Sequence, residues 1–337
     1  MASHFMSPKL VVAVLAWLVV IVWLHLWLNS GLKGREVVRM GYMPVVTNLA
    51  APLLDHVSRG ASGVHFEAVK FASFAEMAEA LRNDNIQAAF IIAPLAVVLH
   101  QQGVDVSVVL IGNRHESTLV AKKSLHAKRL EDLVGATVAV PMRYSGHNLC
   151  LLRMLTEKGL KGRIHIVEMN PPDMASALSA GALDAYFVGE PFAAQTVLSG
   201  DAEVVDYVES VWPNFICNLV LVKNSWIAEH PSLVAEMVQA AARSGIWAGR
   251  HPDQAARIAA DYWNQSPDLV VHALTTPPGR IVYDRFVPVV RELQSMADLM
   301  VRYGLIANAD INGLVDDRFA RKASLANIDG MESILNP

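Results

Sequence analysis

From residue 36 onward, short apolar runs alternate with segments in which apolar residues recur at helical spacing. The runs are rich in β-branched residues and have the length of buried strands, and the segments between them predict helices. The predicted strands are 37–41, 64–71, 88–92, 106–111, 137–140, 164–168 and 185–188. This alternation is typical of an α/β protein with mainly parallel sheets.

Two extended segments, 118–122 and 218–223, interrupt the alternation. We interpret them as the places where the chain crosses between two lobes. The prediction is a bilobed α/β fold in which residues 36–118 and 223–330 form the first lobe and residues 119–222 form the second. A ligand is expected in the cleft between the lobes, because hinged domain interfaces commonly close around a ligand.

Residues 10–28, after a short tail of residues 1–9, form an apolar run in which His25 is the only strongly polar residue. As a helix the run would reach about 28 Å, close to the thickness of a bilayer core. It is long for a signal peptide and no small-x-small cleavage motif follows it, so a transmembrane anchor is favoured over a cleaved export segment. Lys33 and Arg35 after the run oppose export of the body, but large domains translocate with less regard to flanking charge. We expect the body on the extracytoplasmic face, anchored to the inner membrane, or secreted if the segment is cleaved.

The composition narrows the range of partners. The chain has 53% apolar and 18% charged residues and a net charge of -4, and no basic stripe stands out, which argues against a nucleic-acid binder. Small molecules or proteins are the expected partners.

Cys150 and Cys217 are far apart and fit neither a CxxC nor a metal-ligand spacing. They could pair, but two small core residues are the favoured interpretation.

The segment 135–157 carries the most informative local pattern. A strand over 137–140 is followed by a turn and then by a helix with leucines at helical spacing. Ser145 is placed to cap this helix, and Gly146 beside it lets a ligand approach the backbone amides that the first turn leaves without partners. A helix start of this kind attracts anions, although an ordinary capped helix fits the same pattern.

The loops after the strands are further candidates, because in open α/β sheets the ligand lies beyond the carboxyl ends of the strands. Polar or conformationally permissive residues occupy four such loops and the approach to the second crossing. The predicted ligand-binding residues are Thr47, Asn48, Ala93, Pro94, Arg143, Tyr144, Ser145, Gly146, His147, Asn148, Glu190 and Asn214.

Three of these residues have more than one predicted role. Glu190 directly follows an apolar strand, where an unpaired acid is costly to bury; it is predicted to accept a hydrogen bond from the ligand, to bind a metal or to cap the helix over 192–198. His147 can donate to an anion as imidazolium, accept when neutral, or help to cap its helix. Arg143 is the nearest candidate counter-ion for a ligand, although an exposed arginine on a turn is the favoured interpretation.

Motifs for catalysis are nearly absent. The chain has no GxSxG, HExxH or P-loop, and no GxGxxG after a strand. Cys150 lies close to the predicted helix start and could act as a nucleophile helped by His147. The leucines that flank it favour a buried thiol instead.

Six distinctive segments occur in the chain: MGYMPVVTNLAAPL, AAFIIAPLA, LVGATVAVPMRYSGHNLCLLRML, ALDAYFVGEPFAAQ, WPNFICNLVLVKNSWIAEHP and ADLMVRYGLI. Together they resemble the nitrate/sulfonate/bicarbonate and taurine-type substrate-binding proteins of ABC importers, over about residues 36–325. Residues 146–148 are similar to the Gly-Thr-His or Ser-x-His turn with which members hold the anion. Residues 189–191 look like the Gly-Glu-Pro of nitrate and bicarbonate binders.

The resemblance implies the type II periplasmic-binding fold, with a hinge of two crossing strands. It implies an extracytoplasmic solute-binding component of an ABC importer, with no enzymatic activity, no cofactor, and permease and ATPase subunits as partners. A small anionic solute such as nitrate, bicarbonate or a sulfonate is favoured, although relatives also bind thiamine pyrimidine precursors and flavins. Two alternatives stay open: a lyase or hydrolase that uses Cys150 and His147, and a membrane-tethered ligand sensor.

Overall fold

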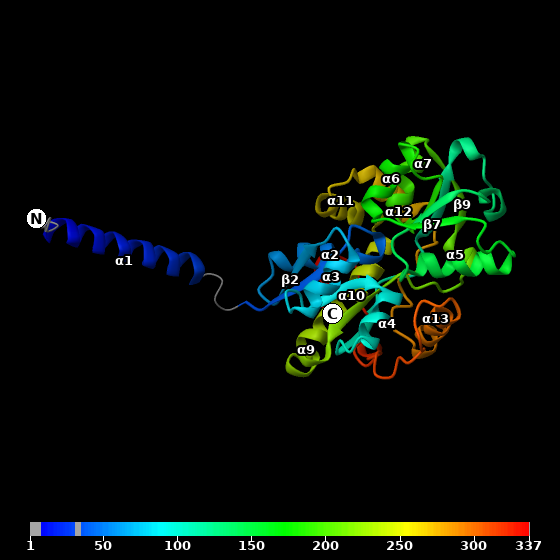
Figure 1. Ribbon diagram of the computed structural model, residues 1–337. Helices are drawn as coiled ribbons and strands as arrows, with labels where there is room; N and C mark the ends of the chain where they lie inside the picture. The colour runs from blue at the N-terminus through cyan, green and yellow to red at the C-terminus, as the bar shows by residue number, and fades with distance from the viewer. Residues whose placement is uncertain (1–7, 31–34, 337) are drawn as a thin grey trace, which may run out of the picture.

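The computed structural model describes the backbone of residues 8–30 and 35–336. Helix α1 (Pro8–Ser30) stands apart from the rest of the chain, which forms two lobes (Figure 1). Its described side chains are exposed, Trp17 and Trp23 among them. Within the described residues, no helix has both the length and the apolar character that crossing a membrane requires. The transmembrane segment predicted over 10–28 is therefore not confirmed, and most of the predicted tail, residues 1–9, lies outside the described part of the chain.

The first lobe is built on a five-stranded sheet in the order β2-β1-β3-β10-β4. Its strands are β1 (Val37–Tyr42), β2 (His65–Lys70), β3 (Ala88–Ile92), β4 (Val106–Ile111) and β10 (Asn218–Lys223). Strand β1 is parallel to β2 and β3, whereas β10 is antiparallel to β3 and β4. Every residue of β3 and β4 is buried, which explains why both read as continuous apolar runs.

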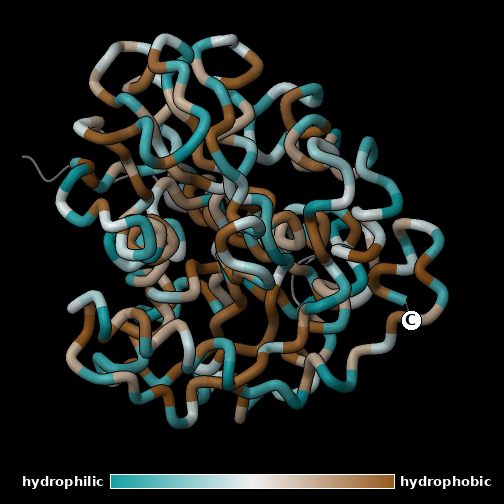
Figure 2. The backbone as a smooth tube through the Cα atoms, turned by 90° about the vertical axis from the view of Figure 1, so that its right-hand side faces the viewer, coloured by the Kyte–Doolittle hydropathy of each residue, from teal (hydrophilic) through white to brown (hydrophobic). Residues whose placement is uncertain are grey.

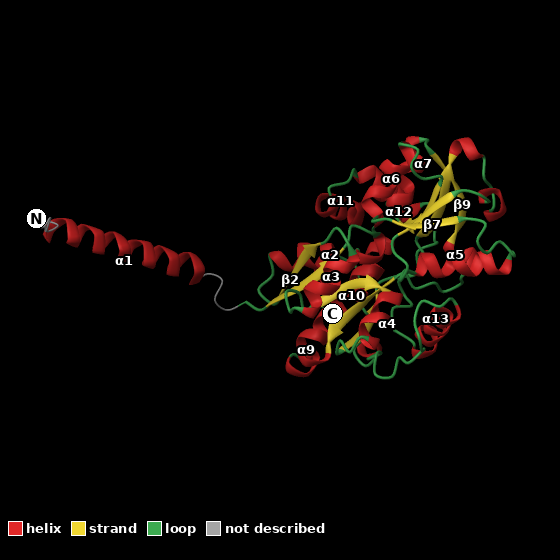
Figure 3. Ribbon diagram, viewed as in Figure 1, coloured by secondary structure: helices red, strands yellow, loops and turns green. Residues whose placement is uncertain are grey.

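The second lobe repeats this arrangement in the order β7-β6-β8-β5-β9. Its strands are β5 (Ser117–Lys122), β6 (Thr137–Val140), β7 (His165–Glu168), β8 (Ala185–Gly189) and β9 (Ala202–Tyr207). Strand β6 is parallel to β7 and β8, and β5 is antiparallel to β8 and β9. The yellow strands of Figure 3 therefore form two separate sheets, one in each lobe.

Helices pack on both faces of each sheet. In β3, alternate residues belong to two different apolar clusters, one containing Ala89 and Ile91 and the other Ala88 and Phe90. The first cluster continues into the second lobe through Tyr186, and Figure 2 shows apolar segments throughout the interior of the body. The helices of the two α/β units are α2 (Ala50–Arg59), α3 (Phe74–Arg82), α4 (Ala93–Gln101), α5 (Gly146–Glu157), α6 (Pro171–Ser179), α7 (Phe192–Ser199) and α8 (Val208–Val211), with short 3-10 turns η1 (Val46–Asn48), η2 (Lys123–Leu125) and η3 (Leu130–Leu133).

The remaining helices follow the second crossing. Helix α10 packs against α2, α13 against α4, and α12 reaches across to α7 of the second lobe. In α10 the buried Arg243 donates to the carbonyls of Ser324, Ala326 and Ser333, which ties the C-terminal segment to the first lobe. These elements are α9 (Asn224–Glu229), α10 (Pro231–Arg250), α11 (Pro252–Trp263), α12 (Pro267–Thr275), α13 (Val290–Arg302), η4 (Ala320–Lys322) and η5 (Met331–Ile334).

The two crossings end in strands that complete the sheet of the lobe they enter. Strand β5 joins the second sheet and β10 joins the first. The boundary predicted at residue 223 therefore falls too late, because β10 pairs with β3 and β4 from Asn218 onward. Strand β9 was not predicted, since it is a half-buried edge strand in which charged residues interrupt the apolar pattern.

Candidate functional site

A turn at the start of α2 places two buried polar side chains at the junction of the lobes. The Met43 amide donates to Asn48 Oδ1 at 2.8 Å, so the amide nitrogen of Asn48 points elsewhere and has no partner. The Thr47 hydroxyl makes no hydrogen bond of ordinary geometry either. The Val46 amide donates to the Glu190 carbonyl at 2.8 Å, which joins this turn of the first lobe to the second lobe.

Residues 112–117, which connect β4 to β5 and form the first crossing in place of the predicted residues 118–122, lie against the same turn. A Cβ atom on Gly112 would lie 2.5 Å from the Thr47 carbonyl oxygen, so only glycine permits this approach. Asn113 Nδ2 donates to the Val46 carbonyl at 2.9 Å, and its Oδ1 has no partner. His115 and Glu116 adopt φ angles of 71° and 67°, a left-handed conformation that is costly for such residues and is often found at ligand sites.

The start of α5 has the predicted capped geometry. Ser145 Oγ accepts from the Asn148 amide at 3.1 Å, which confirms the N-cap. His147 is fully buried, and its Nε2 lies 2.9 Å from Ser117 Oγ on the first crossing. Its Nδ1 has no partner. Burial lowers the pKa of His147 to about 3, so the imidazole is neutral at physiological pH.

The second crossing supplies a thiol and an amide. Cys217 Sγ lies 3.8 Å from His147 Nε2. Asn218 is buried at the start of β10, which packs against η1, and neither its Oδ1 nor its Nδ2 has a partner. Burial, and next the charge of the neighbouring Glu116 carboxylate, raise the pKa of Cys217 well above its ordinary value.

We call Thr47, Asn48, Asn113, His147 and Asn218 the unpartnered cluster. They carry six of the eight buried side-chain nitrogen or oxygen atoms that lack a hydrogen-bond partner in the described part of the chain. Buried polar atoms without partners are uncommon and call for a specific explanation, such as a ligand. The five residues come from both lobes and both crossings, so their unpartnered atoms lie near the junction of the lobes.

Beside this cluster, the charged side chains of a second group all have hydrogen-bond partners within the protein. We call Glu116, Glu190, Glu209 and Arg280 the carboxylate network. Glu116 accepts from the Glu190 amide at 2.7 Å and from the Ser117 hydroxyl at 3.0 Å. Glu190 accepts from the Thr118 hydroxyl and from the Ala194 amide, both at 2.8 Å, so it does cap α7.

Arg280 is the cation of the carboxylate network, and its donors are engaged. It donates twice to Glu209 at 2.9 Å, to Thr118 Oγ1 at 2.9 Å and to the Ser117 carbonyl at 2.8 Å. Burial raises the pKa of Glu116 to about 8 and also raises that of Glu190, with Arg280 acting in the opposite direction. The network therefore offers no free positive charge to the unpartnered cluster.

The structure separates the predicted site residues into two groups. Thr47, Asn48, Ser145, Gly146, His147, Asn148 and Glu190 are buried together with Ala93 and Pro94 near the junction of the lobes. Arg143 is exposed and lies over the ring of the half-buried Tyr144. Asn214 is also exposed, and its side chain accepts from Arg285. Neither Arg143 nor Asn214 reaches the unpartnered cluster.

Sequence reasoning missed three residues that matter here: Asn113, Ser117 and Asn218. The sequence does mark two of them as polar residues at the ends of buried strands, because Asn113 follows the apolar strand β4 and Asn218 begins the apolar strand β10. Both lie next to the predicted crossings, where Asn214 was the only residue expected to contact a ligand.

Cys150 is a buried thiol, as the flanking leucines favoured, and the alternative in which it acts as a nucleophile helped by His147 does not fit the structure. Cys150 is buried in the apolar core of the second lobe, and burial raises its pKa. Cys217 is the thiol near His147, because the second crossing returns alongside the start of α5. Both cysteines are free. Over the residues that the structure describes, no group of three or more His, Cys, Asp or Glu side chains is placed to hold a metal ion.

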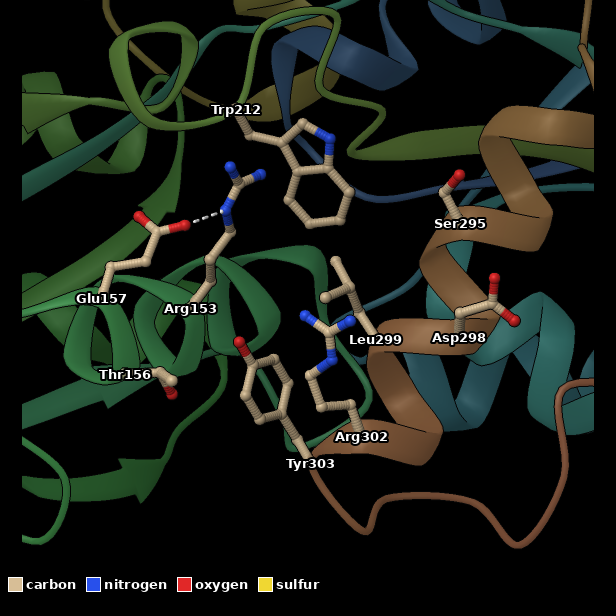
Figure 4. A pocket seen from close by; sticks show the side chains of 9 residues that line it. All are labelled: Arg153, Thr156, Glu157, Trp212, Ser295, Asp298, Leu299, Arg302 and Tyr303. Atoms are coloured by element: carbon tan, nitrogen blue, oxygen red, sulfur yellow. Dashed lines mark hydrogen bonds and ion pairs between the residues drawn. The ribbon is translucent and has the colours of Figure 1, made fainter.

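A separate hollow lies at the outer edge of the lobe junction. Figure 4 shows Arg153, Thr156 and Glu157 of α5 facing Asp298, Leu299 and Arg302 of α13, with Trp212 above them. Its volume is about 430 Å³, and its lining residues are half-buried or exposed. Trp212, from the loop before the second crossing, lines this hollow.

The two sheets with crossing strands and a buried polar junction define a bilobed binding-protein fold. Residues 31–262 match the NMT1-like family, and the chain belongs to that family. It is 31% identical over 198 residues to the taurine-binding periplasmic protein of Escherichia coli, covering 57% of this chain and 59% of that protein. It is 26% identical over 163 residues to a putative aliphatic sulfonates-binding protein of Bacillus subtilis, covering 48% of each. The chain thus spans about half to three-fifths of the length of these relatives.

Solved structures share the fold. The ligand-binding component of an ABC-type import system from Staphylococcus aureus matches with a TM-score of 0.78 at 21% identity, covering 87% of this chain and all of that one. The nitrate-binding protein NrtA from Synechocystis matches with a TM-score of 0.75 at 14% identity, covering 87% and 89% of the two chains. At these identities the likeness establishes the fold alone.

Proposed function

We propose that this protein is the extracytoplasmic solute-binding component of an ABC importer, and that it encloses a small solute between its two lobes. The observation that carries the proposal is the unpartnered cluster, in which six buried polar atoms from both lobes and both crossings lack partners. A bound solute would supply the missing hydrogen bonds, and each such bond is worth about 1 kcal/mol net.

The relatives support the transport assignment and a solute that carries an oxyanion. They are named for taurine, aliphatic sulfonates and nitrate. A further relative, the nitrate import ATP-binding protein NrtC of Synechococcus elongatus, is 23% identical over 232 residues that make up 35% of its length. We therefore propose a permease and an ATPase as the partners of this chain.

The proposed roles follow the positions of the buried residues. Thr47 and Asn48 bind the solute from the first lobe, Ser145 holds the start of α5 in place, and the amides of Gly146 and His147 face the solute. Glu190 positions the turn at Val46 through its carbonyl. Ala93, Pro94 and Asn148 shape the surroundings, and we assign no direct role to Arg143, Tyr144 or Asn214.

Binding is tested by thermal unfolding of the full chain against nitrate, bicarbonate, sulfonates and taurine. A ligand at about 100 times its dissociation constant adds ~2.7 kcal/mol, which should raise the unfolding midpoint by about 4 °C for a body of this size. Replacing His147 or Thr47 by Ala should abolish the shift. Ser176→Ala is the matched control, because Ser176 is exposed on α6 and its hydroxyl bonds the Asp173 carbonyl of the same helix; a shift that survives in both site variants contradicts the assignment.

One observation favours an enzyme as the second candidate, namely the 3.8 Å approach of Cys217 Sγ to His147 Nε2. A nucleophilic cysteine requires a thiolate, but burial favours the neutral thiol and the neutral imidazole here. We therefore propose binding without catalysis. Rapid alkylation of Cys217 by iodoacetamide in the folded protein would support the enzyme instead.

The extracytoplasmic location is part of the proposal and rests on the periplasmic relative. Whether residues 10–28 serve as an export segment or as an anchor stays a prediction, and the anchor has no support from the structure. N-terminal sequencing of the mature chain, together with fractionation of cells into soluble and membrane material, decides between the two.

A sensor without a transporter would bind solute but fail to stimulate the ATPase of a reconstituted permease.

A further inference from the structure

We propose that residues 280–286 form a third connection between the lobes, beside the two crossings, and that Arg280 holds the solute site closed. We call residues 280–286 the clasp segment. The inference rests on the proposed function, in which the lobes part to admit a solute, but it does not depend on which solute binds. Its physical basis is that Arg280 and Tyr283, three residues apart, are fixed to different lobes.

The first lobe holds the chain on both sides of Arg280. Val270 of α12, which precedes the clasp segment, and Phe286, its last residue, are buried in the apolar cluster that includes residues of β1 and β10. The Tyr283 ring lies against α10, where a Cβ atom on Gly245 or Gly249 would come within 3.0 or 3.2 Å of the ring. These separations are shorter than an ordinary carbon–carbon contact, so the two glycines make room for the ring. The clasp segment is therefore part of the first lobe.

The clasp segment also runs antiparallel to the first crossing. The Arg114 amide donates to the Val282 carbonyl at 2.9 Å, and the Val282 amide donates back to the Arg114 carbonyl at 3.3 Å. Further along, His115 Nδ1 lies 3.0 Å from the Arg280 carbonyl oxygen. A movement of the first crossing is therefore transmitted to Arg280 through the backbone.

The side chain of Arg280 makes its contacts with the second lobe. Its guanidinium donates to both carboxylate oxygens of Glu209 in α8 at 2.9 Å, and it lies 4.3 Å from the centre of the Tyr207 ring in β9. It also donates to the Thr118 hydroxyl and the Ser117 carbonyl of β5, at 2.9 and 2.8 Å. The Arg280 side chain is only 4% exposed. Because the clasp segment belongs to the first lobe, parting of the lobes has to break these contacts.

The contacts of Arg280 end beside the solute site. Ser117, whose carbonyl accepts from Arg280, places its hydroxyl 2.9 Å from His147 Nε2 in the unpartnered cluster. On the neighbouring strand β8, the Glu190 carbonyl accepts from the Val46 amide of the first lobe. Interactions made only in the closed arrangement shift the population toward that arrangement. Arg280 is therefore a positioning residue that controls how often the unpartnered cluster is open to water and solute.

A matched pair of variants tests the inference on the full chain. Glu209→Gln weakens the pairing with Arg280, and Glu292→Gln weakens the pairing of Arg114. Each carboxylate receives two hydrogen bonds from a buried arginine, and the two carboxylate side chains are 25% and 29% exposed. The variants differ in what the ion pair joins: Glu209 is in the second lobe and faces the clasp segment, whereas Glu292 ties the first crossing to α13 of the first lobe.

Hydrogen–deuterium exchange of the ligand-free protein measures the opening. The Val46 amide is protected by its bond across the lobes, whereas the amides of β3 are protected by the sheet of the first lobe. In Glu209→Gln we expect the peptide that contains Val46 to exchange about tenfold faster while the β3 peptide is unchanged, because the open state becomes more populated. Glu292→Gln should not accelerate the Val46 peptide selectively. Small-angle scattering should show a larger radius of gyration for Glu209→Gln alone.

Equal exchange of the Val46 peptide in Glu209→Gln and Glu292→Gln overturns the inference. Equal acceleration of the Val46 and β3 peptides in Glu209→Gln also overturns it, because that result reports unfolding of the whole lobe. If Glu209→Gln does not fold, Arg280→Lys is measured in the same way. Lysine keeps the charge but lacks the forked donors of arginine, so a folded Arg280→Lys protein without faster exchange of the Val46 peptide contradicts the inference.

A measurement with solute separates this inference from the proposed function. We call the compound among nitrate, bicarbonate, 1-propanesulfonate and taurine that raises the unfolding midpoint of the unaltered chain the responsive probe. Its release, followed by stopped-flow tryptophan fluorescence, should be about tenfold faster from Glu209→Gln than from Glu292→Gln. Equal release rates contradict the role of Arg280 and leave the proposed function standing. If none of the four compounds raises the midpoint, the proposed function is contradicted, and the exchange experiment still decides the role of Arg280.

Discussion

The unpartnered cluster and the carboxylate network lie side by side and differ in whether their hydrogen bonds are complete. In the carboxylate network, Glu116, Glu190, Glu209 and Arg280 all have partners within the protein. In the unpartnered cluster, six side-chain atoms have none. A closed network stabilises the hinge region by itself, whereas an incomplete one lowers stability until a ligand completes it. This difference separates the polar residues that hold the two lobes together from those that are proposed to bind the solute.

The largest effect is expected from opening the closed network. Arg280→Met leaves Glu209 and Glu190 without their cation, and removal of one partner of a buried ion pair costs about 3 to 5 kcal/mol. Urea unfolding measures the loss. Arg318→Met, which removes an exposed ion pair with Asp316, is the control and should change stability by less than about 1 kcal/mol. Equal effects of the two variants would show that the network contributes nothing special.

The next effect is the pH dependence of stability that the carboxylate network should produce. The pKa of Glu116 is raised to about 8 by burial, so between its ordinary value and about pH 8 the folded state keeps a proton that the unfolded state has lost. Stability should therefore fall as pH rises through this window, by up to about 1.4 kcal/mol per pH unit. Glu116→Gln should flatten the slope, as measured by urea unfolding from pH 5 to pH 9. Glu67→Gln, at an exposed position pairing with Arg39, should leave the slope unchanged.

Replacing a residue of the unpartnered cluster by an apolar one should raise the stability of the ligand-free protein. Asn218→Leu replaces an unpartnered amide by an apolar group of similar shape, so the ligand-free protein should gain about 1 kcal/mol. The same variant should lose solute binding. Asn224→Leu is the contrast, because the Asn224 amide is bonded to Asp105 and Ser107 and should lose stability. A destabilised Asn218→Leu protein would mean that the amide has a structural partner.

The smallest effect compares two helix caps. Ser145→Ala and Ser73→Ala each remove a side-chain oxygen that caps a helix, α5 and α3 respectively, at a cost of about 1 kcal/mol. Only Ser145→Ala should also weaken solute binding, because α5 starts at the lobe junction. Thermal unfolding with and without the responsive probe measures both quantities, and equal loss of binding in the two variants would exclude a specific role for Ser145.

The local pattern of the sequence was sufficient for the elements and for one cap. The apolar runs predicted β1 to β4 and β6 to β8, whereas β5 and β10 were interpreted as crossings and not as sheet strands. Ser145 was identified because N-cap chemistry is local. Contacts between residues far apart in the sequence could not be predicted from the local pattern. Nothing in the sequence around Cys217 shows that it lies beside His147, since their contact joins positions 70 residues apart.

The sequence by itself determined the α/β class, the two crossings and the loops in which to look for a ligand, because hydrophobic periodicity and capping act over a few residues. Only the tertiary structure decided which polar residues are satisfied. Thr118 and Arg280 meet Glu190 across distant parts of the chain, while Asn113 and Asn218 meet no partner for their free atoms. Hydrogen-bond satisfaction depends on the positions of all neighbours in space, and those positions are fixed only when the two lobes come together.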